Sequence, residues 1–226
     1  MLTKFFLFYI LMLLLGNPFL AILVLVGLYL AADVRYVGWT RKMIDTVRTE
    51  REIGELSRQV ALNPYNASAQ NDLGRLLVLR GRFRDALTPL EKAIERMEDS
   101  PETNYYLGLA CLHSGREEEG EARIVKALEL NPRFRYGEPN FRLGAYLLNK
   151  GRIDEARGAL EKGVAIHTSS AEGWYLLGQT LRAGGDKEKA KDYYKKAIES
   201  FRNSPGYKRR EDRRFAWRAR MALRGL

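Results

Sequence analysis

The chain has 226 residues, which is room for one or two domains. Its 38 Lys and Arg against 28 Asp and Glu give a formal net charge of +10. This charge suggests an acidic partner such as anionic lipid, nucleic acid or an acidic protein. The single cysteine, Cys111, excludes an intrachain disulfide framework, a zinc knuckle and a CxxC redox pair. Two isolated histidines and the lack of an HExxH, GxSxG or GxxxxGK(S/T) motif leave no catalytic or metal-ligand set, so the sequence predicts no enzyme, no metal and no cofactor.

An uncharged apolar run extends from Phe5 to Ala32 and is interrupted by Gly16-Asn17-Pro18. As one helix it would be about 42 Å long, enough to cross the roughly 30 Å hydrocarbon core with a tilt or a kink at Pro18. A hairpin at residues 16–18 is the alternative, with legs of about 16 and 21 Å that are each short for a full crossing. The run is also too long for the apolar region of a cleaved signal peptide. The sequence therefore favours a membrane anchor at residues 1–32, a single kinked span over a hairpin.

Two aromatic residues that suit the membrane interface, Tyr36 and Trp39, follow the apolar run. Basic residues follow as well, at Arg35, Arg41 and Lys42, whereas one lysine and the amino terminus precede the run. Because positive charge gathers on the cytoplasmic side, either geometry puts the remainder of the chain in the cytoplasm. We expect a cell-membrane protein, single-pass or re-entrant, with its large domain cytoplasmic.

A repeated pattern follows this segment, with Leu-Gly pairs whose glycines are spaced by 34, 36 and 34 residues. The pairs are Leu73-Gly74, Leu107-Gly108, Leu143-Gly144 and Leu177-Gly178. Seven residues after each pair comes another glycine: Gly81, Gly115, Gly151 and Gly185. Small residues and then bulky ones complete the columns: Ala86, Gly120, Ala156 and Ala190, then Leu90, Ile124, Leu160 and Tyr194. The pattern predicts pairs of antiparallel helices that turn at the second glycine, approach closely at the small residues and stack into a superhelix.

The fullest copy reads Trp174-x2-Leu177-Gly178-x2-Leu181, then Ala190-x3-Tyr194, and it resembles the tetratricopeptide repeat family. The resemblance implies an all-α superhelix and a protein-binding scaffold. Four repeats are expected at residues 67–100, 101–136, 137–170 and 171–204, with two extra residues near Arg135-Tyr136. The expected domains are the anchor at 1–32, a juxtamembrane helical linker with a half repeat at 33–66, the repeats at 67–204 and a basic capping helix at 205–226.

The first helix of each repeat is expected to line a concave groove that binds an extended or helical peptide. The predicted groove residues are Asn71, Arg75, Val78, Tyr105, Leu109, Leu112, Phe141, Leu148, Tyr175, Gln179 and Arg182. The centre of this set is apolar and aromatic, and its ends are polar. An alternative is open for Tyr105 and Tyr175, because tyrosine is common at that position in the family.

The last segment carries eight basic and two acidic residues between Lys208 and Arg224. Phe215, Ala219, Ala222 and Leu223 recur at helical spacing, as do Trp217 and Met221, which predicts a helix that caps the open end of the stack. Its basic side is either solvated or in contact with anionic lipid or an acidic partner. The residues predicted for this contact are Lys208, Arg209, Arg210, Arg213, Arg214 and Arg218.

Taken together, these patterns predict a membrane-anchored protein–protein interaction scaffold that assembles or regulates a membrane or envelope complex. A permanent structural subunit of a membrane complex is the alternative. A nucleic-acid binder that acts through the basic tail is less favoured, and its affinity would depend steeply on salt.

Overall fold

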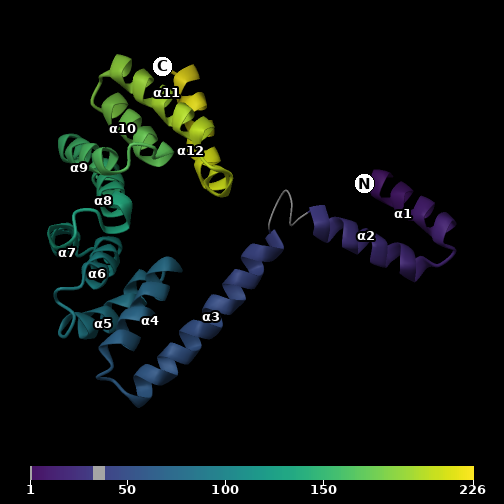
Figure 1. Cartoon of the computed structure of the whole chain (residues 1–226), viewed down its shortest axis with the longest axis horizontal. Helices are drawn as coiled ribbons and strands as arrows, with labels where there is room; N and C mark the ends of the chain where they lie inside the picture. The colour runs from purple at the N-terminus through teal and green to yellow at the C-terminus, as the bar shows by residue number, and fades with distance from the viewer. Residues whose placement is uncertain (1, 33–38) are drawn as a thin grey trace. The chain divides into compact units, whose positions relative to one another are not determined.

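The computed structural model describes the backbone of residues 2–32 and 39–226 and the side chains of residues 9–29 and 43–226. All regular elements in these ranges are helices, so the predicted all-α class is confirmed. The chain divides into two compact units, Met1–Arg58 and Gln59–Leu226 (Figure 1). Of the predicted anchor residues, Tyr36 lies outside the described residues, and so do the side chains of Phe5, Ala32 and Trp39.

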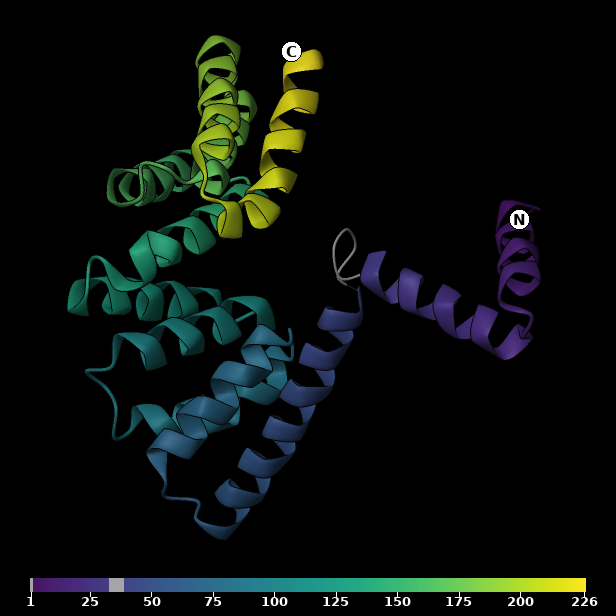
Figure 2. The same ribbon diagram turned by 45° about the vertical axis from the view of Figure 1, so that its right-hand side comes forward.

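The amino-terminal unit begins with two apolar helices, α1 (Leu2–Leu15) and α2 (Pro18–Ala32), which meet at an angle (Figures 1 and 2). Gly16 ends α1 with a φ of +63°, a conformation that glycine adopts without strain. Pro18 then begins α2 at a position where its missing N–H costs no helical hydrogen bond. The Asn17 side chain caps α2 by accepting a hydrogen bond from the Phe19 N–H at 2.9 Å.

The break at residues 16–18 shows that the prediction of one continuous kinked helix over the apolar run is wrong. A kinked helix would need helical backbone on both sides of Pro18, whereas Gly16 is left-handed and a new helix begins at Pro18. Residues 2–32 thus form two helices that turn at the position predicted for the alternative hairpin. Among the helices of residues 2–32 and 39–226, none combines the length and the hydropathy that a transmembrane crossing requires.

A long helix, α3 (Trp39–Leu62), follows and continues past the boundary between the two units. Its two halves differ in how they place apolar side chains. Met43, Ile44 and Val47 in the first half are exposed, whereas Ile53 in the second half is buried.

The second unit contains four helix pairs stacked in chain order and then α12 (Gly206–Arg224) (Figures 1 and 2). The pairs are α4 (Ala67–Leu79) with α5 (Phe83–Ile94), α6 (Pro101–Ser114) with α7 (Glu117–Leu130), α8 (Glu138–Asn149) with α9 (Ile153–Ile166), and α10 (Ala171–Ala183) with α11 (Lys187–Asn203). We call the side formed by the first helices, α4, α6, α8 and α10, the inner face. The side formed by α5, α7, α9 and α11 is the outer face.

Each pair closes around the glycine and the bulky residue that the sequence predicted to oppose each other. A Cβ atom added to Gly74 would lie 2.3 Å from a carbon of Leu90, and one added to Gly144 would lie 2.5 Å from a carbon of Leu160. Real carbon contacts are longer than this, so a larger residue would force the helices apart. The turn glycines, such as Gly81 at a φ of +74°, adopt the left-handed conformation that ends the first helix. The predicted packing within the pairs is therefore confirmed.

Successive repeats are joined in two ways. Three of the four first helices begin at a polar cap: the Asn66, Ser100 and Ser170 side chains each accept a backbone N–H in the first turn of α4, α6 and α10. Before α8 the chain instead makes a short 3₁₀ turn, η2 (Phe134–Gly137), and α8 starts from Gly137 without a side-chain cap. The contact between α7 and α8 is correspondingly slight compared with the contacts between α5 and α6 or α9 and α10.

The chain ends with α12, which packs on both α10 and α11. Phe215 and Ala219 are buried in the same hydrophobic cluster as Tyr175 and Tyr194. Ser204 and the buried Asp212 are joined by a hydrogen bond in which the serine hydroxyl donates to the carboxylate. The apolar face of α12 therefore covers the last repeat, as the helical spacing of the tail indicated.

Candidate partner-binding surfaces

The predicted concave groove is largely closed by the chain itself. Seven of its eleven residues are buried: Asn71, Val78, Tyr105, Leu109, Leu112, Phe141 and Tyr175. Arg75, Leu148 and Gln179 are half-buried, and Arg182 is exposed. The prediction of an open aromatic groove is therefore corrected, because the aromatic residues that were to hold a partner pack against the protein's own helices.

Each central aromatic residue has a covering group from its own chain. The Tyr105 ring meets Phe134 of η2 edge-on at 5.7 Å between centroids, and the Tyr175 ring lies 6.0 Å from Phe215 of α12. Phe141 fills the space left by two glycines, because Cβ atoms added to Gly163 or Gly173 would lie within 2.6 Å of its ring. Burial raises the pKa of the Tyr105 hydroxyl, which agrees with its enclosure.

Polar residues replace the expected apolar groove on the inner face. Arg135 donates to Tyr106 at 3.0 Å and to Glu138 at 2.6 Å, and Arg142 donates to Glu172 at 3.1 Å and reaches Glu138 at 3.3 Å. Burial alone would raise the pKa of Glu138, but the hydrogen bond from Arg135 and the charges of both arginines outweigh it, and the pKa is lowered. This network ties η2, α8 and α10 together.

A polar hollow of about 410 Å³ opens beside this network, between η2, α8, the start of α10 and α12. Its charged lining is mixed: Arg135, Arg142, Lys208 and Arg214 with Glu138, Glu172, Glu211 and Asp212. His167 also lines it, with Nε2 at 3.1 Å from Lys208 Nζ. Because both signs are equally present, the polar hollow suits a polar segment that carries both charges better than a purely acidic peptide.

An apolar trench of about 700 Å³ lies on the outer face between α7 and α9, with α8 at its base. Its apolar lining consists of Val125, Leu128, Pro132, Leu143, Leu147, Gly158, Ala159, Ala165 and Ile166. Glu121, Glu129, Asn140, Glu155 and Lys162 provide the polar lining. On α7 the lining runs from Glu121 to Glu129, which corresponds to a length of about 12 Å, or a little more than two helical turns. The apolar trench can therefore hold a short amphipathic helix.

Sequence reasoning missed the apolar trench, although one signal for it was present. The glycine spacing of 36 residues between the second and third repeats differs from the 34 found elsewhere. The two additional residues are accommodated in η2, where Arg135 and Tyr136 both have positive φ. The slight contact of α7 with α8 follows from this turn, and it leaves the apolar sides of α7 and α9 uncovered.

The basic tail residues are distributed around α12. Lys208 and Arg214 line the polar hollow, and Arg209 donates to the carbonyl oxygens of Ser204 and Arg202. The other predicted contact residues, Arg210, Arg213 and Arg218, have exposed side chains. Cys111 is fully buried, and burial raises the pKa of its thiol to about 11, so it is suited to packing and not to thiolate chemistry.

Comparison with known proteins agrees with this architecture. A model of the tetratricopeptide repeat matches residues 60–133 and 141–207, and the gap falls at η2 and the start of α8. A crystal structure of MamA protein has a TM-score of 0.61 at 23% identity and covers 75% of this chain and 91% of that chain. YrrB, described as a TPR protein with an unusual peptide-binding site, has a TM-score of 0.59 at 22% identity, covering 82% of this chain and 90% of that one.

A mouse protein, Protein O-mannosyl-transferase TMTC1, is 27% identical over 145 residues, or 62% of this chain. The chain spans only 15% of the length of that relative. At these identities the solved structures show the fold, and the family model covers more than half of the chain in two blocks. The repeated glycine columns, the four closed helix pairs and this match lead to one conclusion: the chain belongs to the tetratricopeptide repeat family.

Proposed function

We propose that this chain is a non-catalytic protein-interaction scaffold that holds an amphipathic helix of a partner protein in the apolar trench. The observation that carries the proposal is the open apolar surface between α7 and α9, in a repeat array whose inner aromatic residues are already covered. A short partner helix would bury Val125, which is 44% exposed, together with Leu128 and Ile166. Fully burying an exposed large apolar side chain contributes about 1.5–3 kcal/mol, and covering these partly exposed residues contributes a part of that each.

Site-directed crosslinking in cells tests this proposal. A photoreactive amino acid at Val125 is expected to capture one protein in constant yield, whereas the same group at Arg80, which is exposed outside the apolar trench, is expected not to capture it. Leu128→Glu, placed on the trench wall, should abolish the capture from Val125 while circular dichroism and the unfolding midpoint show that the repeats are folded. Equal capture from both positions, or capture that Leu128→Glu leaves intact, would contradict the proposal.

The polar hollow is a second candidate surface, because it is the open part of the inner face. Arg142 and Glu172 form an ion pair there and are both partly exposed. The charged groups of a polar peptide could pair with each of them in place of this ion pair. YrrB, with a similar fold, is described as having an unusual peptide-binding site. Capture from Tyr136, which is 77% exposed, together with none from Val125, would assign partner binding to the polar hollow instead.

We further propose that α1 and α2 insert into the cell membrane as a re-entrant hairpin and keep the repeats at its cytoplasmic side. Large apolar side chains project outward from both helices, among them Leu14 at 77%, Phe19 at 81% and Leu23 at 70% exposure. Two helices of about 21 and 22 Å can enter the hydrocarbon region and return, with both ends on one side. The basic residues after α2 favour the cytoplasmic side.

Thiol labelling of sealed cells with an impermeant reagent tests this topology. Cysteines introduced at Thr3 and at Asp45 are both expected to be protected until the membrane is opened, and the native Cys111 adds little background because it is buried. Labelling of Thr3→Cys alone from outside would identify a single crossing. A chain that is extracted from membranes by alkaline carbonate would show that the hairpin is not an anchor.

A permanent subunit of a membrane complex is the alternative role. It predicts a stoichiometric companion that persists in mild detergent even when Leu128→Glu blocks the apolar trench. In that case the apolar sides of α1 and α2 would pack on helices of the companion, which the exposed Leu14 and Phe19 would also allow.

A further inference from the structure

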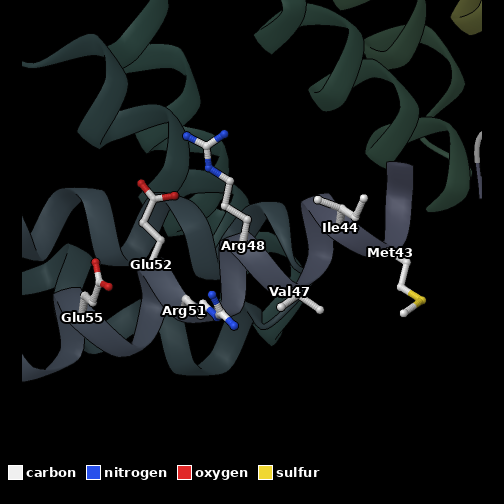
Figure 3. A pocket seen from close by; sticks show the side chains of 7 residues that line it. All are labelled: Met43, Ile44, Val47, Arg48, Arg51, Glu52 and Glu55. Carbon is white, nitrogen blue, oxygen red and sulfur yellow. The ribbon is translucent and has the colours of Figure 1, made fainter. Parts of the chain in front are cut away.

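The first half of α3 carries an apolar stripe that no described part of the chain covers. Met43, Ile44 and Val47 are 54%, 66% and 47% exposed, and they share one side of the helix because Val47 follows Met43 by four residues and Ile44 by three. A shallow hollow of about 630 Å³ lies along this side (Figure 3). Exposed apolar side chains gathered at helical spacing indicate a contact surface.

The charges along the same side of α3 change sign with distance from the apolar hairpin. Figure 3 shows Arg48 and Arg51 beside the stripe and then Glu52 and Glu55 at its far end. From Trp39 to Arg51 the helix has four basic and two acidic residues, and from Glu52 to Arg58 it has one basic and two acidic residues. The half of α3 nearer to the hairpin is thus the basic half.

The chain connection limits how far α3 can start from the hairpin. Only residues 33–38 separate Ala32 of α2 from Trp39 of α3, and fully extended they span at most about 25 Å. If α1 and α2 are inserted in a bilayer, as proposed above, the basic and apolar half of α3 starts at the headgroup region. An amphipathic helix with basic flanks binds there by burying its apolar side at the acyl boundary, while its cations meet anionic headgroups.

We infer that the first half of α3 lies on the surface of an anionic bilayer, with Met43, Ile44 and Val47 in the interface and Arg48 and Arg51 on lipid phosphates. This contact rests on the proposed hairpin anchor and adds to it, since α3 would hold the repeats at the membrane surface as a second attachment. Removing one arginine is expected to shift the equilibrium between the bound and free helix about five-fold, as a contribution of ~1 kcal/mol per basic residue implies.

The test uses the full chain, with Cys111→Ala as background, in vesicles of phosphatidylcholine with 30% phosphatidylglycerol. An environment-sensitive fluorophore is placed on Met43→Cys or Val47→Cys, and on Asp45→Cys as the matched control. Asp45 is exposed and lies on the opposite side of the helix from Met43 and Val47. Brominated lipid is expected to quench the two stripe probes at least two-fold more than the Asp45 probe. Arg48→Gln with Arg51→Gln should reduce this difference.

Flotation of the same vesicles separates the two proposals. A chain that does not float lacks the hairpin anchor, and the proposed membrane attachment is then wrong. A chain that floats while bromolipid quenches all three probes alike keeps the anchor and overturns the inference about α3. Disulfide-linked dimers through Val47→Cys at high yield would also overturn it, because the stripe would then be covered by a second copy.

Discussion

The carboxyl-terminal half of the array is closed at two joins, between α9 and α10 and between α11 and α12, whereas the join between α7 and α8 at its centre is open. Between α9 and α10, residues 167–170 make the turn, Ser170 caps α10 and the Trp174 indole donates to Thr168 at 2.7 Å. Between α7 and α8, residues 131–137 pass through η2, and the next helix begins from a left-handed glycine. The closed join buries its apolar residues, whereas the open join exposes the apolar trench.

This difference indicates where a repeat array can take up extra residues without losing its fold. Inside each pair, the glycine and the bulky residue opposite it leave no free space, so the pair admits one geometry. A join between pairs is made by fewer contacts and a short connection, so two extra residues can be taken up there. The surface proposed for partner binding therefore lies at a join and not within a pair.

The largest expected effect concerns the closed join between α11 and α12. Phe215→Ala removes a ring that is 6% exposed and packs on Tyr175, so it should lower the free energy of unfolding by about 3–5 kcal/mol. Urea titration followed by circular dichroism measures this change. Trp217→Ala, on the same helix with its ring 60% exposed, is the control and should change stability by no more than about 0.5 kcal/mol. Similar losses for both would mean that α12 is not packed as described.

The next effect compares one substitution inside a pair with the same substitution beside the apolar trench. At Gly108 an added Cβ would lie 2.6 Å from Ile124 and 2.9 Å from the Gly120 carbonyl oxygen, so Gly108→Ala should cost about 1–3 kcal/mol. At Gly158, also inside a helix, nothing lies within 4 Å of the added atom. Gly158→Ala should therefore stabilise the protein by about 0.5–1 kcal/mol through helix propensity. Equal effects of the two variants would contradict the close approach of α6 and α7.

The pairs could be predicted from the sequence because their packing depends on residue size at fixed spacing. Gly144 and Leu160, for example, are sixteen residues apart in one local unit, and a size pattern repeated four times identifies such a contact. Hydrophobic character and periodicity likewise indicated the face of α12 that carries Phe215.

The inner face could not be predicted because it depends on the path of the chain between repeats. Nothing in the residue types at 134–137 specifies that Phe134 turns back over Tyr105 or that Arg135 reaches Tyr106. Whether an aromatic residue on the inner side of a first helix is exposed or buried depends on the path of the chain between repeats. The break at Gly16 is similar, since glycine permits a kink or a full turn and the left-handed φ decides between them.

A smaller effect is expected at the open join itself. Gly137 has a φ of +78°, so Gly137→Ala should cost about 1–2 kcal/mol. Tyr136 has a φ of 54° and is largely exposed, so Tyr136→Gly should relieve strain and stabilise the fold by up to about 1 kcal/mol after the added freedom of the unfolded chain is counted. Unfolding midpoints in urea measure both. A loss of stability with Tyr136→Gly would show that the side chain packs more than its exposure indicates.

The smallest expected effect is a pH dependence of the free energy of unfolding, which we attribute to His167 beside α12. Burial, together with the charge of Lys208, lowers the pKa of His167, and the charge of Asp212 partly opposes this shift. Below the unfolded pKa of about 6.5, the unfolded chain takes up a proton that the folded chain does not. The stability that neutral His167 contributes to the folded state is thus fully present above about pH 6.5. It is lost as the pH falls toward the lowered pKa of His167 in the folded chain.

His167→Gln removes this titration while it keeps an acceptor for Lys208, whose Nζ lies 3.1 Å from His167 Nε2. Urea midpoints at pH 7, 6 and 5 should therefore fall less steeply for the variant than for the natural chain. His113, whose pKa burial also lowers, lies outside this contact, so it contributes the same slope to both chains and cancels in the comparison. Parallel slopes would mean that protonation of His167 does not disturb the contact between the α9–α10 turn and α12. A difference in slope would locate the acid sensitivity at the join that α12 closes, apart from the open join where the partner is proposed to bind.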